Sequence, residues 1–189
     1  MKDVVSQIVE MYGQERVFYS ILVYGSVPDV KIQFNQRRTD DQLVTFIKNI
    51  NRVSGSALGP TLDKAKEAFN QYGRPGARKV LVVITDRKSD SDAKVLQEKA
   101  SLLEQAKIKV IPVGLGSEID KTELQILTPR EKDIITKPNT VSTEYLVDVI
   151  MRKGLEGISF FLLSYLCLSG VISRGIKTCF HITSELRSF

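Results

Sequence analysis

The stretch Lys79-Val80-Leu81-Val82-Val83-Ile84-Thr85-Asp86 decides the fold class of this 189-residue chain. Its aliphatic run, Val80–Ile84, has no polar interruption, which is typical of a central parallel strand that helices cover on both faces. The run stops at Asp86, and in open α/β sheets the ligand crevice lies beyond the carboxyl ends of the strands. Asp86 is therefore the first candidate functional residue.

The segments on both sides of this strand alternate between helical and strand patterns. Further strands are expected at Val17–Tyr24, Val110–Val113 and Ile134-Ile135. Helical spacing of apolar residues predicts helices between them, for example over Leu62–Tyr72, and a last helix that ends in a Gly154 cap. This alternation predicts an α/β fold, an open and mostly parallel sheet with right-handed crossovers and helices on both faces.

Turn and cap signals refine this outline. Val30–Phe34 alternates apolar and polar residues after a Gly-Ser-Val-Pro-Asp turn, so it is expected to pair antiparallel with Val17–Tyr24 as an edge hairpin. Thr39 followed by Gln42 predicts a capping box. Asp92 or Ser91 is expected to cap the helix near Ala93, and Asp120 with Glu123 a short helix through Leu127.

The composition excludes several classes of protein. With 42% hydrophobic and 26% charged residues, the chain is neither wholly disordered nor collagenous nor a multi-span membrane protein. Lys and Arg number 27 against 22 Asp and Glu, a net charge of +5 spread along the chain, so no nucleic-acid partner is expected. The uncharged stretch 157–173 is shorter than the roughly 20 residues of a membrane span, and the amino terminus lacks a signal-peptide pattern.

Three roles for Asp86 follow from its position. The carboxylate could ligate a hard cation such as Mg²⁺, accept a phosphoryl group, or cap the following helix, and local sequence favours the cap. The small-residue loop Gly55–Gly59 could bring the Ser56 hydroxyl beside Asp86. This loop is not a P-loop, because it lacks the Gly-Lys-Ser/Thr ending.

Four segments together resemble a known family. They are the Gly55–Gly59 loop with its helix, the strand Gly76–Asp86, the later Val110–Gly116, and Asp120–Leu124. In this order they resemble the von Willebrand factor type A domain, especially its extracellular-matrix branch in type VI collagen and matrilins. The resemblance runs over residues 1–153, which leaves residues 154–189 as an apolar and then basic tail.

The resemblance implies a Rossmann-like sheet with a metal-ion-dependent adhesion site. In such a site Mg²⁺ or Mn²⁺ completes its coordination with an acidic residue of a protein partner. Ser56 falls at the family's loop hydroxyl and Asp86 at its aspartate. The Asp-x-Ser-x-Ser motif has no counterpart, Leu58 replaces a second hydroxyl, and Arg87 stands where the family usually has Gly. The site is therefore expected to be partial, binding a cation only if the missing motif is supplied.

The resemblance also implies that the first strand of the domain is missing. That strand would be central, so its loss leaves a slot in the sheet. The run Ser159–Leu168 is a candidate to fill the slot as a parallel strand, and a weakly ordered or mis-assembled tail is the alternative.

The expected function is a non-enzymatic interaction or adhesion module of an extracellular or matrix protein, with a matrix or collagen-like protein partner. One alternative is a truncated product without independent function. Another is a phosphoryl-transfer enzyme that uses Asp86, but that chemistry needs an acidic pair for Mg²⁺ and a positioned lysine, which the strand ends do not clearly supply.

Overall fold

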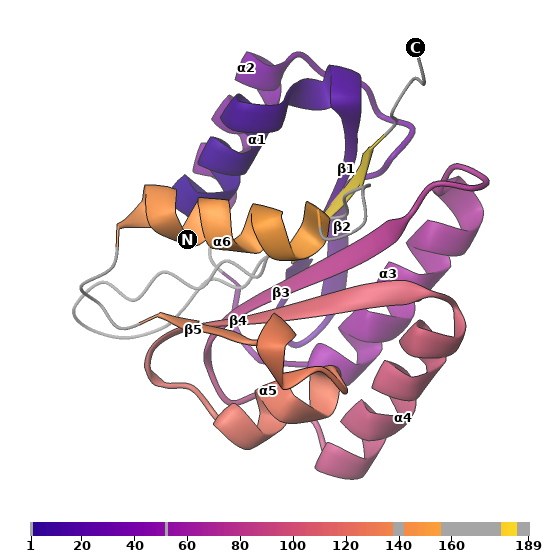
Figure 1. Ribbon diagram of the computed structural model, residues 1–189, viewed down its shortest axis with the longest axis vertical. Helices are drawn as coiled ribbons and strands as arrows, with labels where there is room; N and C mark the ends of the chain where they lie inside the picture. Colours follow the sequence, from indigo (N-terminus) through magenta and orange to yellow (C-terminus); the bar gives the residue numbers. More distant parts are fainter. Residues whose placement is uncertain (1, 52, 138–141, 156–178, 185–189) are drawn as a thin grey trace.

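A computed structural model describes residues 2–51, 53–137, 142–155 and 179–184 of the chain. Helices and strands alternate along it (Figure 1). In order, they are α1 (Lys2–Arg16), β1 (Val17–Tyr24), β2 (Pro28–Ile32), α2 (Asp40–Asn49), α3 (Leu58–Tyr72), β3 (Lys79–Arg87), α4 (Ala93–Gln105), β4 (Ile108–Glu118), α5 (Lys121–Leu127), the 3₁₀ turn η1 (Glu131–Asp133), β5 (Ile135–Lys137), α6 (Thr143–Leu155) and β6 (Cys179–Ser184).

The strands form one sheet in the order β2-β1-β6-β3-β4-β5. The strands β3, β4 and β5 are parallel, with Leu81 opposite Val110 and Val113 opposite Ile135. The β1–β2 pair is an antiparallel hairpin at one edge. The predicted α/β architecture, with a parallel part made of β3, β4 and β5 and an antiparallel edge hairpin, is confirmed.

Helices cover both faces of this sheet (Figure 1). On one face α1 contacts both α2 and α6, and on the other α4 contacts both α3 and α5. The strand β3 lies between these layers, and its residues from Val80 to Asp86 are all buried. The continuous aliphatic run is therefore a consequence of burial on two faces.

Side-chain caps fix the starts of α2, α4 and α5. Gln42 N–H donates to Thr39 Oγ1 at 3.2 Å and Thr39 N–H donates to Gln42 Oε1 at 3.1 Å, which is the predicted capping box. The strand β2 ends at Ile32, short of the predicted Phe34, because Gln36 N–H turns back to the Gln33 carbonyl. Gly154 lies inside α6 instead of after it, so its expected role as a cap is not observed.

The slot predicted between β1 and β3 is occupied by β6, and β6 runs antiparallel to both neighbours. Phe180 lies opposite both Ile21 of β1 and Val82 of β3. The prediction that Ser159–Leu168 enters this slot as a parallel strand is wrong in segment and direction. The parallel direction was expected for a strand that follows directly after the last helix, but residues 156–178 separate α6 from β6 in the sequence, so that expectation does not apply to β6.

The stretch 159–168 itself, like the candidate membrane segment 157–173, lies outside the described residues. None of the helices that the structure does describe is long and apolar enough to cross a membrane.

Candidate functional site

Asp86 lies at the carboxyl end of β3, as expected, but the strand continues one residue further, to Arg87. Thr85 is opposite Gly114 and Arg87 is opposite Glu118, so the pairing with β4 shifts at Asp86. Irregularities of this kind often redirect a side chain at the rim of a sheet. The Asp86 side chain is 6% exposed, and the Arg87 Nε atom lies 3.2 Å from its Oδ1.

The side chain of Thr85 fixes the backbone of Arg87. Its hydroxyl donates to the Arg87 carbonyl at 2.5 Å, and the Arg87 N–H lies 3.2 Å from the same oxygen. The tight turn keeps residue 87 against the strand end. As a result, the guanidinium is positioned beside the carboxylate of its immediate neighbour.

Ser56 reaches the same edge of the sheet through close backbone contacts. Ser26 N–H donates to the Ser54 carbonyl at 2.6 Å, and Ala57 N–H donates to the Gly25 carbonyl at 2.8 Å. A Cβ atom on Gly25 would lie 2.2 Å from the Ser54 carbonyl oxygen, so only glycine permits this approach. The loop before α3 is thereby held against the turn between β1 and β2.

The loop between β3 and α4, residues 88–92, meets the Ser56 loop from the other side. Asp90 N–H donates to the Ser56 carbonyl at 3.0 Å, and Gly59 N–H donates to Ser91 Oγ at 2.9 Å. The Ser56 hydroxyl is 3.4 Å from the Lys88 carbonyl, to which it donates. Three loops therefore converge at the carboxyl edge, but the Ser56 hydroxyl is engaged with a backbone carbonyl.

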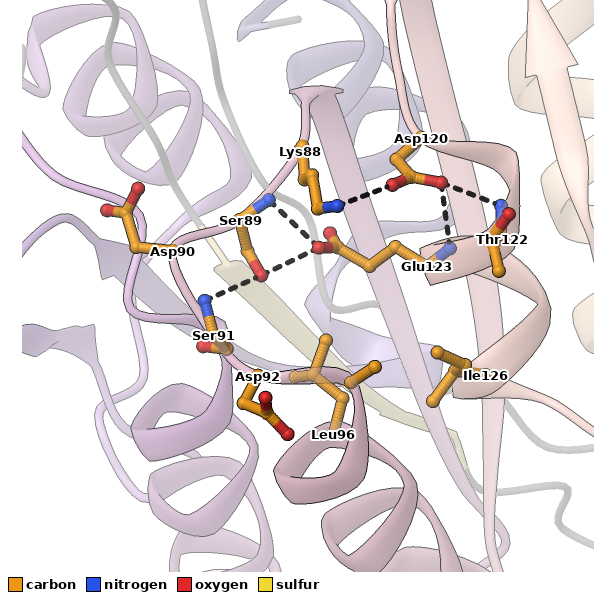
Figure 2. Close-up of a pocket in the computed structure, with 11 residues that line it drawn as sticks. Lys88, Ser89, Asp90, Ser91, Asp92, Leu96, Asp120, Thr122, Glu123 and Ile126 are labelled. Atoms are coloured by element: carbon orange, nitrogen blue, oxygen red, sulfur yellow. Dashed lines mark hydrogen bonds and ion pairs between the residues drawn. The ribbon is translucent and has the colours of Figure 1, made fainter.

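A buried glutamate ties the 88–92 loop to α5 (Figure 2). Glu123 is 4% exposed, and its Oε2 accepts hydrogen bonds from Ser89 N–H at 2.9 Å and from Ser89 Oγ at 2.7 Å. Burial raises the pKa of Glu123 above its ordinary value, although the bonds from Ser89 oppose this. The glutamate therefore serves as a cross-link between segments 34 residues apart.

This role of Glu123 goes beyond what the sequence predicts. Asp120 does cap α5, since its Oδ1 accepts from Thr122 N–H at 2.9 Å and Glu123 N–H at 3.3 Å. The Glu123 side chain, however, crosses to Ser89. Glu123 precedes the buried Leu127 by four residues, so both lie on the inward face of α5, and that spacing is the signal that could have identified it.

A second link joins the same two segments. The Lys88 ammonium lies 3.1 Å from Asp120 Oδ2, and the hydrogen bond from Lys88 is the main reason why the pKa of Asp120 is below its ordinary value. The Lys88 side chain is 69% exposed. It therefore presents its stem to solvent at the carboxyl edge while its charge is paired with Asp120.

A cavity of about 520 Å³ lies between this loop and α5. Figure 2 shows Leu96 and Ile126 across from one another below Glu123, with the Asp90 carboxylate pointing away. Asp92 accepts from Lys94 N–H at 2.8 Å and caps α4, as predicted. The carboxylates of Asp92, Asp120 and Glu123 around the cavity thus each accept a bond from the protein itself.

The residues present do not fit a complete divalent cation site. No group of three or more His, Cys, Asp or Glu side chains that could hold a metal is found within the described ranges. Asp86 is paired with Arg87, and the hydroxyl of Ser56 donates to Lys88. A hard cation prefers about six oxygen ligands, and this edge does not converge such a set on one point.

Comparisons with known proteins agree with this architecture. The family model described as von Willebrand factor type A domain matches residues 1–148. Collagen alpha-1(XX) chain of Mus musculus is 28% identical over 141 residues, covering 71% of this chain and 10% of the mouse protein. Collagen alpha-1(XXI) chain of Xenopus laevis is 28% identical over 143 residues, covering 73% and 14%. The chain thus spans a small fraction of the length of these relatives.

Among solved structures, proximal thread matrix protein 1 from the mussel byssus shares the fold. The match has a TM-score of 0.73 at 20% identity and covers 86% of this chain and 43% of the mussel protein. Another structure of that protein is described with a zinc occupied MIDAS motif, at a TM-score of 0.69, 19% identity and the same coverage.

Proposed function

Because this chain belongs to the von Willebrand factor type A domain family, we propose that it is a non-enzymatic protein-interaction module of an extracellular or matrix protein. The observation that carries this proposal is the family match over residues 1–148, together with collagens among its relatives. The mussel neighbour, whose name also refers to a matrix, supports the same setting. A matrix or collagen-like protein is therefore the proposed partner.

The proposed interaction surface is the carboxyl edge of the sheet around Ser56 and Asp86. Three loops meet there, and they are cross-linked by backbone bonds and by the Glu123–Ser89 link. A surface held this way loses little conformational freedom when it binds, which favours affinity. The Lys88 side chain carries a charge and is 69% exposed on this surface. We therefore expect it to lie within the contact area.

Phosphoryl transfer to Asp86 is the weaker alternative, and the contacts of Asp86 and Lys88 argue against it. A phosphoryl acceptor needs a carboxylate that is open to attack, but Asp86 is largely buried and faces Arg87. The lysine nearest in sequence, Lys88, is paired with Asp120. These contacts support a binding module in preference to a phosphoryl-transfer enzyme.

The proposal can be tested with the full chain and immobilised triple-helical collagen in a surface plasmon resonance experiment. We expect saturable binding that Lys88→Glu weakens about fivefold, which corresponds to about 1 kcal/mol. Arg78→Glu is the matched control, because Arg78 is also exposed and precedes β3 at the opposite edge of the sheet. It should leave binding within about twofold.

Two results would overturn the proposal in different ways. If Lys88→Glu and Arg78→Glu weakened collagen binding equally, the carboxyl edge would be excluded as the contact surface. An absence of saturable binding to collagen and to a panel of other purified matrix proteins would contradict the interaction module itself, and would favour a product without independent function.

A further inference from the structure

We propose that the guanidinium of Arg87 is a built-in cation that takes the place of a divalent metal at Asp86. A carboxylate that is nearly buried is costly unless a positive charge or hydrogen bonds compensate it. The structure supplies such a charge one residue away, with Arg87 Nε at 3.2 Å from Asp86 Oδ1. The guanidinium thereby balances the negative charge of Asp86 without an ion from solution.

The geometry of the turn makes this cation difficult to displace. Thr85 Oγ1 bonds both the N–H and the carbonyl of Arg87, so the backbone that carries the guanidinium is fixed against the strand. A tethered group competes at a high effective concentration with any free ion. A divalent cation would have to displace Arg87 before it could reach the carboxylate.

Displacing Arg87 would not give a cation further ligands from Ser56, Glu123 or Asp120, because their oxygens are already engaged. The Ser56 hydroxyl donates to the Lys88 carbonyl, Glu123 accepts two bonds from Ser89, and Asp120 caps α5 and pairs with Lys88. A cation at Asp86 would gain one carboxylate there and would have to break one of these contacts to gain the Ser56, Glu123 or Asp120 oxygen. The affinity of a site for a divalent cation falls with fewer charged ligands, so Arg87 remains paired with Asp86 in preference to the cation.

The charge balance at Asp86 does not depend on the identity of the partner. A protein partner would meet the edge of a guanidinium there, since the Arg87 side chain remains 38% exposed. The interaction of the carboxyl edge should accordingly be insensitive to chelators.

The test is a Mn²⁺ titration of the full chain, in which electron paramagnetic resonance measures free Mn²⁺. The wild-type chain should leave free Mn²⁺ at the level of protein-free buffer up to about millimolar concentration. Arg87→Ala should lower free Mn²⁺ measurably at concentrations where the wild type does not, and Asp86→Asn in that background should abolish the gain. Lys88→Ala is the matched control, because it removes a cation one residue further on that pairs with Asp120.

Either of two results would overturn the inference. One is wild-type Mn²⁺ binding that Asp86→Asn removes, since the metal would then displace Arg87. The other is an Arg87→Ala variant that binds Mn²⁺ no better than Lys88→Ala. Circular dichroism establishes that each variant is folded, and Arg87→Gln serves in place of Arg87→Ala if the alanine variant does not fold.

Discussion

The two ends of the sheet each bury an aspartate, but they compensate its charge with different partners. At the amino end of β4, Asp133 is fully buried, with Lys109 Nζ at 3.5 Å from Oδ1 and Arg130 Nε at 3.0 Å from Oδ2. At the carboxyl end of β3, Asp86 is paired with its neighbour Arg87. The first arrangement spans two segments, whereas the second lies within a single turn.

The Asp133 pairs therefore link distant elements of the fold, whereas the Asp86–Arg87 pair affects only one turn. Lys109 of β4 also donates to the Lys153 carbonyl of α6, so the Asp133 cluster joins β4, η1 and α6. Neither Asp133 oxygen makes a hydrogen bond within the described part of the chain, so the ion pairs alone compensate it. Loss of a partner at the amino end should therefore affect the whole fold, and a change at the carboxyl end should affect mainly the loop.

The largest effect is expected for Lys109→Met, which keeps the aliphatic stem but removes the charge closest to Asp133 on β4. Without Lys109 the fully buried Asp133 keeps only Arg130, whose side chain is 51% exposed, so its charge is incompletely compensated. The free energy of unfolding should therefore fall by about 3 kcal/mol in urea denaturation. Lys79→Met on the adjacent strand is the control, with an expected change of under about 0.5 kcal/mol. Equal losses in both variants would contradict the structural role of the Asp133 cluster.

The next effect is expected for Glu123→Gln, which weakens the charge-assisted bonds from Ser89. Hydrogen bonds to a charged group contribute more than neutral ones, so we expect a loss of about 1–2 kcal/mol in the same assay. Glu118→Gln is the control, because Glu118 is exposed at the same end of the sheet. Amide exchange should also accelerate at Ser89 in Glu123→Gln, and unchanged protection there would rule out the cross-link.

A smaller loss is expected for Arg87→Gln. The guanidinium is partly exposed, so solvent screens its pairing with Asp86, and the free energy of unfolding should fall by about 1 kcal/mol or less. Differential scanning calorimetry of Arg87→Gln beside Lys109→Met measures the comparison directly. A loss as large as that of Lys109→Met would remove the distinction between the two ends.

Local chemistry explains which features the sequence predicts. The strand Val17–Tyr24, the Thr39–Gln42 capping box and the caps at Asp92 and Asp120 were expected and are confirmed, because each depends on residues within a few positions. The burial of β3 follows from its uninterrupted aliphatic run. Asp86 was also expected at the carboxyl edge of the sheet, because the ligand crevice lies beyond the strand ends there, and the small-residue loop was expected to bring Ser56 beside it.

Contacts between distant segments explain what the sequence does not predict. Nothing near Asp133 or Glu123 indicates that their partners are Lys109 and Ser89, which lie 24 and 34 residues away. The position and direction of β6 depend on pairing with β1 and β3, and an apolar run elsewhere in the tail gave the wrong segment. The pairing of Asp86 with Arg87 depends on the Thr85 turn, which only the folded backbone defines.

The smallest effect is a pair of opposite pH dependences at the carboxyl end. Burial raises the pKa of Glu123 above 4.5, so just above that pH the folded state binds more protons than the unfolded state, and the free energy of unfolding falls as pH rises. The stability deficit of Glu123→Gln should therefore shrink as pH rises through this window. Urea denaturation at half-unit pH steps measures the trend.

Asp120 should show the reverse trend. The hydrogen bond from Lys88 lowers its pKa below 3.8, so just below that pH the unfolded state binds more protons, and the free energy of unfolding rises with pH. The deficit of Asp120→Asn, which keeps a residue able to cap α5, should grow as pH rises through that window. Burial disfavours the charged form of Glu123, whereas the Lys88 ammonium favours the charged form of Asp120. Trends of the same sign in the two variants would therefore contradict the two links.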